Sequence, residues 1–152
     1  MDNDKVISTL NDLIETCRDG LNGFKEAADN VKSLDLKNLF NEIGNERGKC
    51  VQELQLEVRR LGGDPEKTGS TAGALHRTWM DIKGTLMGKD DHTILVECER
   101  GEDSAVSAYR DALKLGLPTN LNLIVQRQYQ TIQQDHDRIK ELRDARAATS
   151  GR

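Results

Sequence analysis

Apolar residues recur at steps of three and four along most of this chain, a spacing that predicts amphipathic α-helices. The pattern predicts four long helices, over about residues 4–31, 34–61, 91–116 and 117–145, followed by a frayed tail over residues 146–152. Short turns join the first helix to the second and the third to the fourth. Each of these two pairs is therefore expected to form an antiparallel hairpin.

The connection between the two hairpins is too long for a tight turn. It starts at a firm helix stop, the sequence LGGDP at residues 61–65, and Ser70 or Thr71 can cap a shorter helix anchored by Trp79. Two hairpins joined by one long crossover predict an all-α, ferritin-like antiparallel four-helix bundle with a short helix in the crossover between helices two and three. We expect a single domain over residues 1–145.

Composition narrows the class of protein further. Of the 152 residues 32% are charged and 3% are aromatic, a balance that favours a helical bundle over a sheet protein. A net charge of −4 gives no electrostatic basis for binding nucleic acid or a membrane surface, so neither partner is expected. The chain has no apolar run of membrane-spanning length, and its acidic, amphipathic start does not resemble a signal peptide. Cys17, Cys50 and Cys98 lack CxxC spacing and are interpreted as free thiols of a cytoplasmic protein.

The sequence ECERGED, residues 97–103, contains the acidic residues whose role most needs an explanation. Glu99 and Glu102 are three residues apart, so they project toward one face of the third helix. Glu102 also falls on the apolar stripe of that helix, between Cys98 and Ala105. A carboxylate in that position is costly unless it is ion-paired, hydrogen-bonded or bound to a cation.

Antiparallel pairing indicates which polar residues share one level of the bundle. Counting outward from the first short turn places Asp19 on the first helix beside Glu46 on the second. Counting outward from the last turn places His136 on the fourth helix opposite Glu99 and Glu102. We therefore expect these five residues to occupy one slab of the interior.

At these positions the chain resembles known helical bundles. The pairs Glu99-x-x-Glu102 and Gln133-x-x-His136 look like a degenerate copy of the carboxylate site of rubrerythrins and ferritins. The runs LHRTWM (75–80), ECERGED (97–103) and QQDHDRIKELRD (133–144) resemble a bacterial ferritin-like family known mainly as a domain of unknown function. This resemblance implies a ferritin-like four-helix fold and no particular activity.

The chain departs from a ferritin-type di-iron site, which needs a Glu from each of two helices and Glu-x-x-His pairs from the other two. Lys49 stands where the histidine of the second helix belongs, and Gln133 stands where the fourth helix needs an acid. Leu21 stands where members of the similar family often carry an acid, and Asp19 is a shorter substitute.

Two interpretations of the carboxylates follow. In the first, Arg47, Lys49 or Arg100 neutralises Glu99 and Glu102 in a buried ion-pair network. The protein is then a non-catalytic or stress-associated scaffold with a degenerate carboxylate site, without catalytic residues or a cofactor.

The alternative interpretation is a metal-binding oxidoreductase or a metal-handling protein. It would hold a single iron, manganese or zinc ion through Glu99, Glu102 and His136, with Glu46 and Asp19 as further candidate ligands.

Two other questions stay open at this stage. His136 can instead be a boundary histidine paired with Asp135 or Asp137. The chain can also be a helical interaction module that forms a homodimer through the face around Trp79, with contacts from Leu75 to Leu86.

Overall fold

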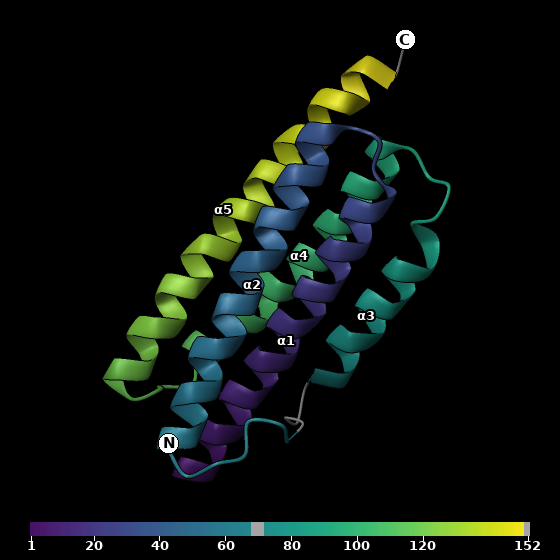
Figure 1. The fold of residues 1–152 in the computed structure, drawn as a ribbon. Helices are drawn as coiled ribbons and strands as arrows, with labels where there is room; N and C mark the ends of the chain where they lie inside the picture. Colours follow the sequence, from purple (N-terminus) through teal and green to yellow (C-terminus); the bar gives the residue numbers. More distant parts are fainter. Residues whose placement is uncertain (68–71, 151–152) are drawn as a thin grey trace.

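The computed structural model describes residues 1–67 and 72–150, and within these ranges the chain is all-α. The helices are α1 (Asn3–Asn30), α2 (Leu34–Arg60), α3 (Ala72–Thr85), α4 (Asp91–Leu113) and α5 (Thr119–Ser150). The four long helices pack as a bundle, and the short helix α3 lies between α2 and α4 in the chain (Figure 1). The predicted all-α bundle with a helix in the crossover is confirmed.

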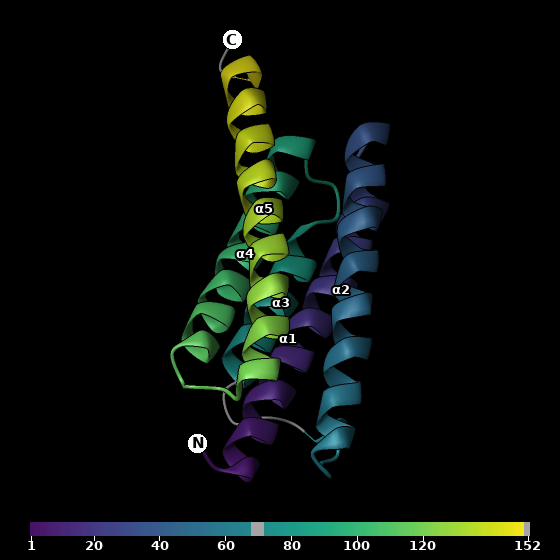
Figure 2. The ribbon, with the colours of Figure 1, turned by 90° about the vertical axis from the view of Figure 1, so that its left-hand side faces the viewer.

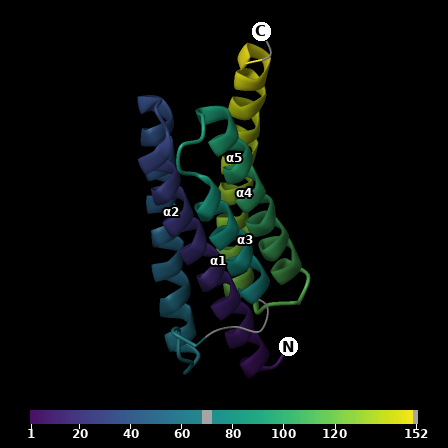
Figure 3. The same cartoon turned by 90° about the vertical axis from the view of Figure 1, so that its right-hand side faces the viewer.

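The helices are ordered as two hairpins joined by one crossover. α1 and α5 run in one direction and α2 and α4 in the other, so α1 packs antiparallel to α2, and α4 antiparallel to α5 (Figures 1 and 2). α1 also packs against α4, and α2 touches α5, which leaves α2 and α4 on a diagonal of the bundle. α3 runs along the outside against α1 and α4 (Figure 3).

Two aspartate side chains fix the start of α4. Asp90 caps α4 by accepting a hydrogen bond from the Thr93 backbone N–H at 2.8 Å. The neighbouring Asp91 accepts from the backbone N–H groups of Lys32 and Ser33, at 2.8 and 3.0 Å. The start of α4 is therefore tied to the turn between α1 and α2. The predicted caps Ser70 and Thr71 lie outside the described residues.

The largest difference from the predicted helix limits is at the C-terminus. α5 extends to Ser150, beyond the predicted helix limit near residue 145. α4 ends at Leu113, three residues before the predicted Gly116, and α5 begins at Thr119. Within the described residues, no helix is long and apolar enough to cross a membrane.

The core forms two apolar clusters, one toward each end of the bundle. Along α2, Val51 belongs to one cluster and Ile43 to the other, and along α4 Ala105 and Cys98 divide in the same way. The residues midway between them, Arg47 on α2 and Glu102 on α4, lie where the clusters meet, and they are the most deeply buried charged residues of the described chain.

Trp79 anchors α3 as the sequence predicts, and it does so from inside the bundle. Its ring packs between Gly23 of α1 and Gly101 of α4, where a Cβ atom would overlap it. Ile82 and Leu86 are buried with it. These three residues of the segment considered for a homodimer contact are therefore part of the core, whereas Met80 is exposed; the Leu75 side chain lies outside the described residues.

Candidate functional site

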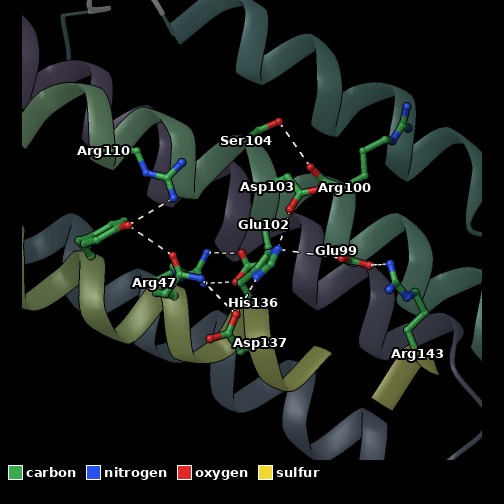
Figure 4. Close-up of polar contacts among 12 residues, drawn as sticks. Arg47, Glu99, Arg100, Glu102, Asp103, Ser104, Arg110, His136, Asp137 and Arg143 are labelled. Atoms are coloured by element: carbon green, nitrogen blue, oxygen red, sulfur yellow. Dashed lines mark hydrogen bonds and ion pairs between the residues drawn. The ribbon is translucent and has the colours of Figure 1, made fainter. Parts of the chain in front are cut away.

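An ion pair with two hydrogen bonds occupies the centre of the bundle. Arg47 Nη1 donates to Glu102 Oε1 at 2.7 Å, and Nη2 donates to Oε2 at 2.6 Å (Figure 4). The pair spans the diagonal of the bundle, because α2 and α4 share no direct helix–helix packing. Arg47 therefore connects two helices whose backbones are not adjacent.

Both partners are almost completely removed from solvent, with 1% of Arg47 and none of Glu102 exposed. Burial raises the pKa of Glu102, and the adjacent Arg47 guanidinium opposes that shift. Glu102 raises the pKa of Arg47, against the effect of burial. Charge-assisted, two-point pairs of this geometry are among the strongest protein hydrogen bonds, and here the pair compensates the cost of burying two charges.

The sequence makes room for this arginine from two sides. Gly20 of α1 leaves space for the guanidinium, because a Cβ there would lie 3.1 Å from Arg47 Nη1. The Phe24 ring lies below the guanidinium, 5.7 Å from its Cζ atom, which is within the range of a cation–π contact.

A second acidic group meets Arg47 from α5. Asp135 Oδ2 lies 3.4 Å from Arg47 Nη2. Burial raises the pKa of Asp135 to about 7; Arg47 lowers it, and the neighbouring Glu46 carboxyl raises it. One oxygen of Glu46, Oε2, is buried and has no hydrogen-bond partner among the described residues. Arg47 therefore pairs with two acids, Glu102 and Asp135, and the surroundings of Asp135 favour its protonated form.

A separate polar cluster lies between α4 and α5. His136 Nε2 is 2.6 Å from Asp103 Oδ1 and 4.0 Å from Glu99 Oε1, and its Nδ1 is 3.1 Å from Asp137 Oδ1 (Figure 4). Burial lowers the pKa of His136, but the carboxylates of Asp137 and Asp103 outweigh burial, and the net pKa is raised. Glu99 also pairs with Arg143.

This second cluster is the group among the described residues with the composition and spacing of a metal site. One potential ligand atom from each of Glu99, Asp103 and His136 lies within 4.8 Å of the others. Two carboxylates and an imidazole suit a divalent first-row metal such as zinc, manganese or iron. Arg143 pairs with Oε2 of Glu99, and Asp137 contacts Nδ1 of His136, which leaves the His136 Nε2 atom facing Asp103 and Glu99.

The five sequence-predicted candidates divide among three groups of partners. Glu102 and Glu46 lie near Arg47, and Glu99 and His136 belong to the cluster on the α4–α5 side. Asp19, expected beside Glu46, has its Oδ1 2.8 Å from His76 Nδ1 on α3, which packs against α1.

Sequence reasoning missed three partners: Asp135, Asp103 and Arg143. The burial of Asp135 could have been predicted, because this residue falls on the apolar stripe of α5 between the buried residues Ile132 and Ile139. No sequence pattern distinguishes Asp103, since its side chain projects from an exposed position on α4. Lys49, a predicted alternative to Arg47, is exposed, and Arg100 pairs with Asp81 and Glu97.

Comparison with known families gives one match. A family described as a domain of unknown function, DUF2383, matches residues 5–115, from α1 to just beyond α4. α5, which carries Asp135 and His136, lies beyond the matched residues. No curated protein matches the chain.

Proposed function

Because the chain belongs to the DUF2383 family, a domain of unknown function, we propose its role from its own geometry: a non-catalytic, ferritin-like helical scaffold. In this proposal Arg47 neutralises the interior carboxylates, a task that two metal ions perform in ferritin-like enzymes. The observation that carries the proposal is the doubly hydrogen-bonded Arg47–Glu102 pair at the centre of the bundle.

The order of the helices supports the ferritin-like part of the proposal. Two antiparallel hairpins joined by one long crossover are the connection of ferritin-like bundles. Here the crossover includes α3 and carries the chain back along the outside of α1 and α4 (Figure 3). The result is the arrangement of long helices from which ferritin-like sites are built.

The residues at the centre do not fit a dinuclear carboxylate site. Such a site takes a Glu from two helices and a Glu-x-x-His pair from the other two. α2 offers Glu46 followed by Lys49, and α5 offers Gln133 followed by His136. A metal ion at Glu102 would have to displace Arg47, and breaking a buried ion pair costs about 3–5 kcal/mol.

Aerobic oxidation of ferrous iron tests the proposal. We expect the purified protein to oxidise added Fe²⁺ no faster than the same buffer without protein, as followed by the absorbance of the ferric product. A protein-dependent rate that saturates at two irons per chain and is lost in Glu102→Gln would overturn the proposal. Circular dichroism of the variant establishes that it is folded.

A second candidate function, binding of one metal ion, is favoured by the cluster of Glu99, Asp103 and His136. Its ligand atoms lie within 4.8 Å of one another, and it does not use Glu102. This site is therefore compatible with the Arg47–Glu102 pair and with a metal-handling role. Arg143 pairs with Oε2 of Glu99, and the other carboxylate oxygen, Oε1, faces His136.

Calorimetric titration with zinc chloride tests this second candidate, with His136→Ala as the variant. His92→Ala is a matched control, because His92 lies near the start of α4, outside the cluster. Binding of about one zinc per chain in the wild type and the control, with loss in His136→Ala, would support the site. Equal zinc binding by all three proteins, or no binding by any of them, would exclude this metal site.

A further inference from the structure

α2 and α5 diverge toward the end of the bundle at which α2 begins (Figure 2). Of the helix pairs that touch, these two make the least contact with each other. A cavity of about 300 Å³ lies between them at this end. We call it the α2–α5 cavity; its lining residues are Asp35, Leu36, Asn38 and Leu39 of α2 and Arg138 and Leu142 of α5.

The buried side of the α2–α5 cavity is apolar. Leu36 is 2% exposed and belongs to the apolar cluster at this end of the bundle. Leu39 of α2 and Leu142 of α5 pack against the same cluster but are only partly buried. Because burial of apolar surface is favourable, the part of these two leucines that stays accessible favours an apolar group in the cavity.

Two opposite charges flank the cavity, one from each helix. Asp35 and Arg138 are both exposed, and neither side chain forms an ion pair or a hydrogen bond with another described residue. A guanidinium group binds a carboxylate through two parallel hydrogen bonds, and a carboxylate accepts hydrogen bonds from an ammonium group. The rim of the cavity can therefore bind one anionic and one cationic group at the same time.

Charge and volume together narrow the class of ligand. A carboxylic acid without an amine would leave Asp35 unpaired beside a like charge, and an amine without a carboxylate would do the same to Arg138. Ligand pockets in proteins have volumes of roughly 300–1,000 Å³, so this cavity is at the lower end of the range. A small zwitterion with an aliphatic side chain matches the two charges, the apolar lining and the volume.

We propose that the α2–α5 cavity binds a free aliphatic α-amino acid, with L-leucine as the representative ligand. The carboxylate of the amino acid pairs with Arg138, and its ammonium group pairs with Asp35. Its side chain packs between Leu39 and Leu142. The site shares no residue with the central ion pair or with the candidate metal cluster, so it gives the scaffold a binding activity beyond its proposed function.

A nuclear magnetic resonance titration of the isotopically labelled chain with L-leucine tests the proposal, because amide chemical shifts report both the affinity and the location of the ligand. We expect a dissociation constant of about 1 mM or lower, with the shifts concentrated at residues 35–39 and 138–142. The absence of saturable shifts up to about 10 mM L-leucine would overturn the proposal, as would saturable shifts centred elsewhere. Shifts at these residues caused by raising the protein concentration alone would also overturn it, because a second copy of the chain would then occupy the cavity.

Three analogues each remove one part of the ligand. Glycine lacks the aliphatic side chain, isocaproate lacks the ammonium group, and isoamylamine lacks the carboxylate. We expect each analogue to bind at least about fivefold more weakly than L-leucine, because each loses one of the three contacts. An analogue that binds as tightly as L-leucine would overturn the proposed binding mode.

Two variants and a matched control assign the binding to the cavity. Arg138→Gln and Asp35→Asn should each weaken L-leucine binding at least about fivefold. Lys140→Gln changes an exposed basic residue of the same helix that does not line the cavity, and it should bind like wild type. Circular dichroism establishes that the three variants are folded. Equal affinities of Arg138→Gln and wild type, or an equal weakening in Lys140→Gln, would overturn the proposal.

Discussion

Arg47 and Glu102 join the two diagonally opposed helices of the bundle, α2 and α4, through two hydrogen bonds in an interior that excludes solvent. The two helices share no close backbone contact, so the two side chains reach across the diagonal. A buried ion pair of this kind makes each partner necessary once the other is present.

A double-mutant cycle measures that dependence. Arg47→Met and Glu102→Leu should each lower the free energy of unfolding by about 3–5 kcal/mol, because each leaves one charge unpaired in the interior. The double variant should lose clearly less than the sum of the two single losses, since it leaves neither Arg47 nor Glu102 charged. Urea denaturation followed by circular dichroism gives the four values. Additive losses would mean that the pair is not coupled.

The raised pKa of Asp135 predicts how stability depends on pH. The pKa of Asp135 is about 7 in the folded protein and close to 3.8 in the unfolded chain, so the folded state binds the proton more tightly. The stabilising contribution is complete below about pH 4 and is lost as the pH rises through about 7. We expect Asp135 to reduce the free energy of unfolding by about 2–3 kcal/mol between pH 5 and 8.

Asp135→Asn should flatten this pH dependence, because the side chain can no longer ionise beside Glu46. Asp111→Asn, at an exposed position on α4, is the control and should leave the slope unchanged. Urea midpoints at several pH values supply the comparison. If wild type and Asp135→Asn had the same slope, the proton would be bound elsewhere.

The tight packing of Trp79 against Gly101 predicts that one added methyl group at residue 101 strongly lowers the stability of the protein. In Gly101→Ala the new Cβ would lie 2.6 Å from Trp79 Cε2, so the ring and α3 must move. We expect a loss of about 2–3 kcal/mol and a red shift of tryptophan fluorescence as the ring meets water. Gly84→Ala, on α3 with nothing within 4 Å of its Cβ, should instead stabilise the protein by about 0.5–1 kcal/mol. Equal stabilities of the two variants would contradict the packing of Trp79.

The fold was largely predictable because periodicity and caps are local signals. The long helices, the crossover helix and the Asp90 cap all follow from spacing and residue type. The site was less predictable because it depends on register between helices. Counting from the last turn placed His136 opposite Glu99 and Glu102, but its nearest acid across the α4–α5 pair is Asp103.

Other partners were unpredictable for a similar physical reason. Asp19 was expected beside Glu46 of α2, but a helix in a bundle has several neighbours, and α3 supplies its partner His76. A long side chain also reaches beyond its own level, as Arg143 does toward Glu99. The prediction that a basic residue, with Arg47 among the candidates, neutralises Glu102 needed no register, since an acid on an apolar stripe requires a partner.

The most direct measurement of the central claim is metal content per chain after expression with iron, manganese and zinc supplied. Wild type, Glu102→Ala and His136→Ala are compared by elemental analysis. Because Arg47 already neutralises Glu102, we expect Glu102→Ala to hold as much metal as wild type, with any single equivalent lost only in His136→Ala. About two equivalents in wild type that disappear in Glu102→Ala would contradict the account, because the central carboxylates would then bind metals and not the arginine.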